Sequence, residues 1–354
     1  MQILWRRSVT AYSFAVRDIA DDHRLPLEMK KMRKVKVLYH DNCFDGVSSA
    51  AVFSRFYKGH IDRAAEIEYE GLTHKAGQQM SDGLFGPDEN VIVDFKYCAS
   101  DKLTWWFDHH ESAFLSAQDE AHFRRDTGGH KFHDASYKSC TKFIAHVTGT
   151  VFHYPMPDLD NLVYWADIID GAQFPDAKTA VELKEPAMRL MLVIEASHNP
   201  ELIHKIIREL QHKSLANVMD DSQIGSTFEK LYAHHFESIE IMRRAARCTD
   251  GVIEFDVSGY DLDGYNKFIP YYLFPESVYS VGVSQSAVRA KVSVGTNPWT
   301  KRERRQNLAK LCEQYGGGGH SVVAAISFRP NELDKARAAA REIAEILQND
   351  LKGN

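Results

Sequence analysis

The chain has 354 residues, a formal net charge of -6, 44% hydrophobic residues and 26% charged residues. This composition is typical of a soluble globular protein, and the length suggests about two domains. The acidic balance argues against a protein that coats long nucleic acid through charge alone. No apolar run reaches the ~18 residues of a membrane span. No apolar signal core follows Arg6 and Arg7, so we expect a cytoplasmic protein without membrane contact.

The cysteines are odd in number, scattered along the chain, and form no CxxC pair: Cys43, Cys98, Cys140, Cys248 and Cys312. In an oxidising compartment an even set with regular spacing would indicate a disulfide framework. The observed pattern instead fits free thiols in a reducing cytoplasm.

Strand and helix patterns alternate from residue 35 to about residue 180. Predicted strands cover residues 35–39, 66–70, 91–93 and 103–107, and predicted helices cover residues 47–57, 137–147 and 161–169. Such alternation predicts an α/β domain with a parallel sheet. We assign this domain to residues 35–180, preceded by an extension, residues 1–34, that has no clear period.

The remainder of the chain divides into a helical part and a second mixed part. Residues 181–250 carry helical patterns at 186–196, 200–215 and 226–247, with Pro186 and Pro200 suited to first turns. This predicts a helical linker. Strand patterns return at 252–257, 279–283, 288–294 and 322–328, with helices near 306–315 and 332–347. They predict a smaller α/β domain of residues 251–350.

The triplet Asp108-His109-His110 directly follows the apolar run from Leu103 to Phe107. Successive side chains of an extended segment point to opposite faces, so one imidazole can face a metal while the other faces another part of a pocket. A carboxylate with an imidazole suits a divalent ion such as Mn²⁺. A surface turn that contains two histidines is the alternative, and the triplet alone does not decide between them.

Two further acids stand in apolar surroundings. Asp94 ends the strand pattern of residues 91–93, and a buried carboxylate there needs a partner or a cation. It could equally cap a following helix. Asp167 lies inside an apolar helical stretch and is the better ligand candidate of its segment, because Asp170 before Gly171 is explained by the helix end. A buried, hydrogen-bonded role is the alternative for Asp167.

The segment from His40 to Gly46 joins a predicted strand to a predicted helix. As a metal loop it offers four donors, namely His40, Asp41, Cys43 and Asp45. A helix N-terminus at this point could also hold a phosphate. Asp45 as a simple helix cap and Cys43 as a packing residue are the alternatives.

A run of glycines ending in a histidine lies in the second domain: Gly316, Gly317, Gly318, Gly319 and His320. Successive glycines let backbone N–H groups approach an anion closely, so the run is a candidate substrate loop. Arg289, Lys291 and Asn297 are candidates to assist it. The nearby basic run of Lys301, Arg302, Arg304 and Arg305 is better explained as the solvated start of a helix.

Taken in order, these segments resemble the motifs of the DHH phosphoesterase superfamily with its trailing DHH-associated domain, over roughly residues 35 to 330. The first motif is His40 to Gly46, the second is Asp94, the third is Asp108-His109-His110 and the fourth is Asp167. The run from Gly316 to His320 matches the trailing domain. Five segments in the family's order are far more specific than any one of them.

The resemblance implies a centre of two metal ions, usually Mn²⁺, with Mg²⁺ or Co²⁺ as substitutes. It implies Asp45, Asp94, His109 and Asp167 as ligands, with Asp94 bridging. The catalytic residues would be Asp108, His109 and His110. Among them, His110 would contact the scissile phosphate and Asp108 would support the cluster. Gly316 to His320 would grip the far end of the substrate.

The first motif departs from the family, because many members carry Asp where this chain has Cys43. Three explanations stay open. The thiolate binds metal and favours a softer ion. One metal site is weak. Alternatively, His40 or Asp41 replaces the missing ligand.

We therefore expect a Mn²⁺-dependent phosphodiesterase that hydrolyses short oligonucleotides or linear dinucleotides to mononucleotides. Hydrolysis of polyphosphate, or of a nucleotide such as 3′-phosphoadenosine 5′-phosphate, is a second hypothesis. A non-catalytic nucleotide sensor is a third, supported only by Cys43. An aromatic side chain near Gly316 to His320 would favour nucleotides, and Lys and Arg alone would favour polyphosphate. The expected partner is a small phosphorylated substrate, and a homodimer is compatible with the sequence.

Overall fold

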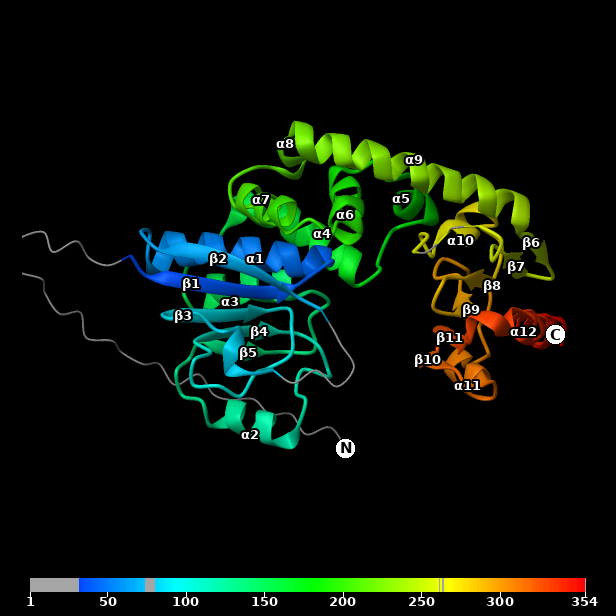
Figure 1. Cartoon of the computed structure of the whole chain (residues 1–354), viewed down its shortest axis with the longest axis horizontal. Coiled ribbons are helices and arrows are strands. Elements are labelled where there is room, and N and C mark those ends of the chain that lie inside the picture. Colours follow the sequence, from blue (N-terminus) through cyan, green and yellow to red (C-terminus); the bar gives the residue numbers. More distant parts are fainter. Residues whose placement is uncertain (1–31, 74–79, 261, 263, 354) are drawn as a thin grey trace, which may run out of the picture. The chain divides into compact units, whose positions relative to one another are not determined.

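The computed structural model describes residues 32–73, 80–260, 262 and 264–353. The predicted extension, residues 1–34, lies almost entirely outside the described residues. Within the described part, two β-sheets and the helices around them account for most of the chain (Figure 1).

The first sheet, sheet A, has five parallel strands in the order β2-β1-β3-β4-β5. Their bounds are β1 Lys34–His40, β2 Glu66–Leu72, β3 Glu89–Val93, β4 Trp105–Asp108 and β5 Lys131–His133. Alternate residues of these strands enter two different cores. Val37 and Phe107 pack on one face, whereas Leu38 and Trp106 pack on the other. The strands are apolar on both faces because helices or loops cover both sides of a parallel sheet.

Helices α1 (Phe44–Phe56), α3 (Cys140–Thr150) and α4 (Asp160–Asp170) share the core that contains Val37 and Phe107. Helix α2 (Ala117–Arg125) covers part of the opposite face, where Phe123 contacts Trp106 at a ring-centroid distance of 5.2 Å. Asp45 and Gly46 lie in the first turn of α1, directly after the end of β1. A side chain at Gly46 would collide with the carbonyl of His40, so glycine permits the close approach of α1 to the strand end.

A helical segment follows sheet A. Its helices are α5 Ala177–Glu182, α6 Pro186–Ala196, α7 Pro200–Leu210, α8 Leu215–Met219 and α9 Ser222–Ala245. Helices α6 and α7 each have a proline in the first turn, as the sequence predicted. Residues of α6, α7 and α8 join the core of sheet A through Val193, Ile206 and Val218.

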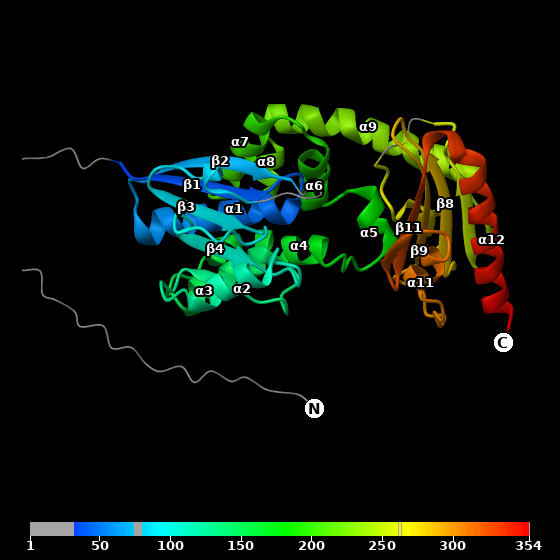
Figure 2. The same ribbon diagram turned by 60° about the horizontal axis from the view of Figure 1, so that its bottom comes forward.

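The second sheet, sheet B, has six strands in the order β10-β11-β9-β8-β7-β6. Their bounds are β6 Arg247–Thr249, β7 Val252–Asp256, β8 Tyr279–Gln285, β9 Ala290–Thr296, β10 Gly318–His320 and β11 Val323–Phe328. Only β7 and β8 pair in parallel. Helices α10 (Ile269–Leu273), α11 (Leu308–Glu313) and α12 (Leu333–Lys352) complete this region. Figure 2 shows α12 along the strands, and Ile343 and Leu347 of α12 are buried in their core.

The structure confirms the predicted fold class: a parallel α/β sheet and a second, smaller α/β region. The sequence did not reveal α2 and β5, because α2 is polar with no buried residue and β5 has only three residues. No helix in the described part of the chain is long and apolar enough to cross a membrane.

Candidate metal centre

Three neighbouring strands of sheet A bring polar side chains to one edge. Strand β1 ends at His40, Asp94 directly follows β3, and β4 ends at Asp108, which His109 follows. The strands are parallel, so their carboxyl ends meet at the same edge. The strand order reverses between β1 and β3, and such a reversal is where α/β sheets commonly bind ligands.

Asp94 lies at the centre of this edge and is 1% exposed. Its backbone has a φ of 56°, in the left-handed region that non-glycine residues seldom adopt. One carboxylate oxygen, Oδ2, lies 3.3 Å from Nδ1 of His40. Burial raises the pKa of Asp94, but the histidines His109 and His40 outweigh that effect and hold it well below the usual range. Asp94 is therefore an anion in the folded protein.

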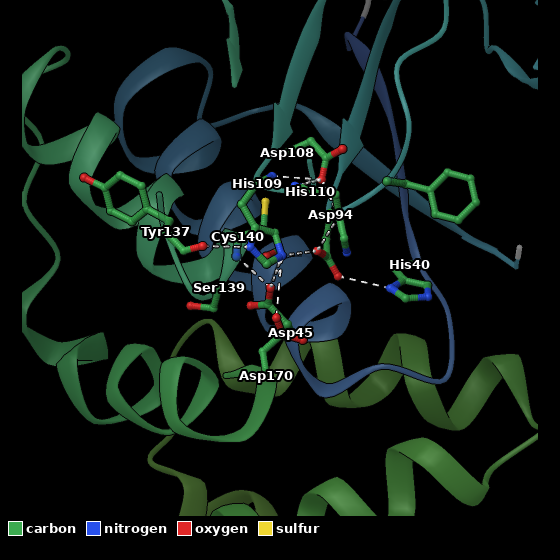
Figure 3. Close-up of polar contacts among 12 residues, drawn as sticks. His40, Asp45, Asp94, Asp108, His109, His110, Tyr137, Ser139, Cys140 and Asp170 are labelled. Atoms are coloured by element: carbon green, nitrogen blue, oxygen red, sulfur yellow. Dashed lines mark hydrogen bonds and ion pairs between the residues drawn. The ribbon is translucent and has the colours of Figure 1, made fainter. Parts of the chain in front are cut away.

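His109 faces three carboxylates, as Figure 3 shows. Its Nε2 lies 3.3 Å from Asp94, 3.6 Å from Asp170 and 3.8 Å from Asp45. On the other side of the ring, Nδ1 lies 3.2 Å from the carbonyl oxygen of Tyr137. A proton on Nδ1 that is donated to this carbonyl leaves the Nε2 lone pair directed at the carboxylates, an arrangement typical of metal-binding histidines.

The electrostatics of His109 show how strongly the acids act on it. Burial lowers the pKa of His109, but Asp94, Asp45 and Asp170 outweigh this and raise it to about 10. A proton on Nε2 thus provides the positive charge that the three carboxylates require when no other cation is present. A metal ion would compete with that proton for the same nitrogen.

Asp45 is buried and anchors the next helix. Its two carboxylate oxygens accept the backbone N–H groups of Cys140, at 2.6 Å, and Thr141, at 3.0 Å, at the N-terminus of α3. The pKa of Asp45 is raised well above its usual value by burial and then by the charges of Asp94 and Asp170. Asp45 therefore has a structural role, and it also contributes to a concentration of negative charge that is costly to bury without a cation.

The fourth acid of the cluster is Asp170, whereas the sequence prediction was Asp167. Asp167 pairs with Nζ of Lys142 at 2.6 Å and belongs to no group of candidate ligands among the described residues. Asp170 groups with Asp45 and His109, and their ligand atoms lie within 4.8 Å of one another. The cluster lies at the last turn of α4, and three residues advance a helix by about 4.5 Å. Burial, followed by Asp94, raises the pKa of Asp170 to about 6.

Asp108 and His110 form a supporting pair beside the cluster. Oδ1 of Asp108, which is fully buried, accepts the backbone N–H of His109 at 2.9 Å and lies 2.7 Å from Nδ1 of His110. The hydrogen bond with Asp108 raises the pKa of His110 although burial opposes the shift. Asp108 therefore fixes the backbone of the triplet and favours a positively charged His110.

The donors of the first motif are not all brought to the cluster. His40 and Cys43 group with Asp94, with ligand atoms within 4.8 Å of one another. Asp41 joins none of the candidate groups found among the described residues, and its Oδ1 accepts the N–H of Asn42. The explanation in which Asp41 replaces a missing ligand is therefore not supported by the geometry.

The donor set fits divalent cations. Two buried atoms at its centre, Oδ1 of Asp94 and Nε2 of His109, have no hydrogen-bond partner among the described residues. Carboxylate and imidazole groups that converge at these distances are ordinary ligands of Mn²⁺, Co²⁺ and Zn²⁺. Asp94 belongs to two of the candidate groups, one with His40 and Cys43 and one with His109 and His110. It could therefore serve two ions.

Sheet B contains a pocket of about 600 Å³. Five side chains at the pocket are basic or imidazole groups: Lys267, Arg289, Lys291, Arg304 and His320. Aromatic side chains also line it: Tyr265, Phe268 and Tyr271. The sequence indicated Arg289, Lys291 and His320 but treated Arg304 as solvated, and it gave no signal for Tyr265. The pocket therefore offers both positive charge and aromatic surface.

Only the second half of the glycine run lies at the pocket. Gly318 and Gly319 line it within strand β10. Gly316 has a φ of 77° and lies in the turn after α11. Gly317 packs against the carbonyl of Ala325, which leaves no room for a side chain. Of the four glycines that were expected to grip substrate, the structure places Gly318 and Gly319 at the pocket and Gly316 and Gly317 outside its lining. Gly316 and Gly317 shape the turn between a helix and an edge strand.

Asn297, which was expected to assist the substrate loop, lies outside the lining of the pocket. Its Nδ2 donates to the carbonyls of Pro275, at 3.0 Å, and Ser277, at 2.9 Å, and its Oδ1 accepts the N–H of Trp299. Asn297 is 1% exposed and does not line the pocket. Its amide group connects the turn before β8 to the turn after β9, so these hydrogen bonds use the amide within the protein.

No protein-family model and no curated protein matches the sequence. Among solved structures, the chain is similar to the pGpG-specific phosphodiesterase PggH from Vibrio cholerae, with a TM-score of 0.66 and 17% identity over 89% of this chain and 99% of that one. It is also similar to the DHH domain of a member of the S1p family of ribosomal proteins, with a TM-score of 0.53 and 14% identity over 89% and 87% of the two chains. Identities this low show the fold alone. The chain has the fold of the DHH phosphoesterase superfamily.

Proposed function

We propose that the protein is a metal-dependent phosphodiesterase that hydrolyses short oligonucleotides or linear dinucleotides to mononucleotides. The observation that carries the proposal is the convergence of Asp45, Asp94 and Asp170 on Nε2 of His109 at the carboxyl edge of sheet A. The fold shared with a pGpG-specific phosphodiesterase supports the same conclusion.

Two positions for divalent ions are compatible with the candidate groups, one at Asp45, His109 and Asp170 and one at His40, Cys43 and Asp94. Bound ions would activate the attacking water as Lewis acids and neutralise charge on the phosphate. We propose Mn²⁺ for the position that lacks sulfur, because its donors are carboxylate oxygens and one imidazole nitrogen. Mg²⁺ and Co²⁺ are the expected substitutes.

The protein's own groups orient and stabilise the substrate in this proposal. Asp108 holds the ring of His110 through Nδ1, which leaves Nε2 of His110 to donate to a phosphate oxygen. The raised pKa of His110 favours the protonated, cationic ring. A hydrogen bond from a charged group to a phosphate is stronger than one between neutral partners. Asp45 accepts the backbone N–H of Cys140 and so holds the N-terminus of α3 beside the centre.

The pocket of sheet B favours a nucleotide over polyphosphate. Polyphosphate offers only anionic oxygens, for which Arg289 and Lys291 would suffice. The aromatic side chains Tyr265 and Phe268 add a surface on which a base can pack. We therefore assign the pocket to the terminal nucleotide of the substrate, with Arg289 and His320 near its phosphate.

The test is a turnover screen of the purified chain with Mn²⁺ against a linear diguanylate, longer RNA, 3′-phosphoadenosine 5′-phosphate and polyphosphate. We expect mononucleotides from the dinucleotide at the highest rate. Asp94→Asn should lower that rate at least about 100-fold, since loss of even an outer partner of a ligand costs about 10- to 100-fold in affinity or activity. Asp101→Asn is the matched control, because Asp101 is fully exposed in the same β3–β4 segment.

Three outcomes would contradict the proposal. Preference for polyphosphate over every nucleotide would favour an exopolyphosphatase. Preference for 3′-phosphoadenosine 5′-phosphate would favour a nucleotide phosphatase. Tight binding of the dinucleotide without release of mononucleotide, at any of the tested metals, would favour a sensor.

A further inference from the structure

The candidate ligands divide into two sets of different chemistry. One set consists of Asp45, His109 and Asp170 and supplies oxygen and nitrogen. The other consists of His40, Cys43 and Asp94 and adds a sulfur. The sets adjoin each other, because His109 lies 3.3 Å from Asp94. A centre built from them would present different donors to its two ions.

Cys43 differs from a packing cysteine in its position and contacts. Cys140 provides the comparison, because it is fully buried near the same cluster and its Sγ donates to the carbonyl of Phe107 at 3.3 Å. Cys43 is only partly buried and occupies the N-cap of α1 with an extended backbone, yet its side chain makes no capping hydrogen bond. Its thiol therefore lies at the strand end beside the ligand candidates instead of in the apolar core.

A second observation concerns Asp94, the carboxylate that groups with Cys43. Oδ1 of Asp94 is buried and makes no hydrogen bond among the described residues, although Nε2 of His109 lies 3.3 Å from it. Asp94, His40 and Cys43 have ligand atoms within 4.8 Å of one another, so an ion bound at Asp94 would also reach the sulfur. A coordinating metal ion deprotonates a thiol outright.

We propose that Cys43 is a metal ligand and makes the centre asymmetric, with a sulfur-containing position that prefers Co²⁺, Zn²⁺ or Fe²⁺ over Mn²⁺. Thiolate is a softer ligand than carboxylate and selects the more thiophilic ions. The thiol proton passes to solvent when sulfur binds the ion. The inference rests on the metal centre of the proposed function, and it is independent of the substrate.

The test is a titration of the chelator-treated protein with Co²⁺, followed by absorption and by equilibrium dialysis. A thiolate bound to Co²⁺ gives an intense charge-transfer band in the near ultraviolet, which oxygen and nitrogen ligands do not give. We expect this band in the wild type, its loss in Cys43→Ser, and its retention in Cys140→Ser. The latter substitution removes a buried thiol near the same cluster and serves as the matched control.

Cys43→Asp keeps the test decisive if the serine variant folds poorly. It restores a carboxylate, so the band should disappear. The preference of this position for Co²⁺ over Mn²⁺ should fall by roughly tenfold or more, since even outer partners of ligands change affinity about 10- to 100-fold. A band that persists in both Cys43 variants would overturn the inference. So would a wild type that binds two Co²⁺ ions without the band.

The outcome is separable from that of the proposed function. A Cys43-dependent band in a protein that hydrolyses no phosphodiester would leave this inference standing and reject the function. Mn²⁺-dependent hydrolysis without any thiolate band, and with unchanged metal preference in Cys43→Asp, would do the reverse. A protein that binds no Co²⁺ at all would reject the metal ligand at Cys43.

Discussion

The centre on sheet A and the pocket on sheet B place their charged groups in different environments. Asp45, Asp94 and His109 are each less than 10% exposed, and the pKa values of all three are shifted by burial and by one another. Arg289 and Arg304, by contrast, are exposed, and they line a pocket together with aromatic side chains.

This difference separates two kinds of function. Buried charges interact strongly because little water screens them, so the centre on sheet A is poised to hold a cation even before substrate arrives. Exposed arginines interact weakly with any one anion and gain selectivity from the surface around them. We therefore expect substitutions at the centre to change metal binding and rate, and substitutions at the pocket to change affinity for substrate.

The largest expected effect is at Asp170, in the last turn of α4. Asp170→Asn should weaken Mn²⁺ binding at least roughly 10- to 100-fold, because it removes a carboxylate 3.6 Å from His109. Asp167→Asn is the matched control, since it removes only the pair with a half-exposed Lys142, which is worth under about 1 kcal/mol. Isothermal titration of both variants measures the difference. Equal losses of Mn²⁺ affinity in the two variants would contradict the assignment of Asp170, and not Asp167, as the ligand.

The second prediction concerns the stability of the metal-free protein. The pKa of His109 is raised from 6.5 to about 10 in the folded state, so the folded protein retains a proton that the unfolded chain releases between these values. Stability contributed by this proton is fully present below pH 6.5 and is lost as pH rises through about 10, with a slope of at most about 1.4 kcal/mol per pH unit. Urea unfolding with chelator across this range measures the slope. His109→Gln should flatten it, and an unchanged slope in that variant would assign the proton to another group.

The third prediction tests whether Asn297 is structural. Asn297→Ala leaves the carbonyls of Pro275 and Ser277 without their donor, which costs about 1–3 kcal/mol of unfolding free energy. The melting temperature should fall while KM for the dinucleotide stays the same. A higher KM at unchanged melting temperature would restore Asn297 to the substrate site.

The smallest expected effect is at the rim of the pocket. Arg289→Ala should raise KM up to about fivefold, because an exposed ion pair is worth about 1 kcal/mol or less. Stability should not change, since Arg289 is exposed. Arg302→Ala is the control, because Arg302 is an exposed arginine that does not line the pocket. If Arg302→Ala raises KM equally, the effect comes from general charge and not from the pocket.

The sequence by itself determined four of the five strands of sheet A and the polar residues at the ends of three of them. Apolar runs of three to five residues, each followed by Asp94, Asp108 or the donors from His40, indicate strands of a parallel sheet whose carboxyl ends share one edge. That inference is local, because the strand and the polar residue after it are adjacent in the chain. It placed Asp94 and His109 at the same edge without knowledge of their distances.

Only the tertiary structure decided which residue of a helix or loop reaches that edge. Asp167 and Asp170 are one turn apart, and the way α4 packs determines which of them meets His109 and which meets Lys142. Likewise, the amide of Asn297 donates to a carbonyl that is distant in sequence, and Gly317 packs against the carbonyl of Ala325. Cys43 belongs to the same class, because its distance to His40 and Asp94 depends on the close approach of α1 at Gly46. Contacts of this kind depend on packing between elements, which local sequence patterns do not encode.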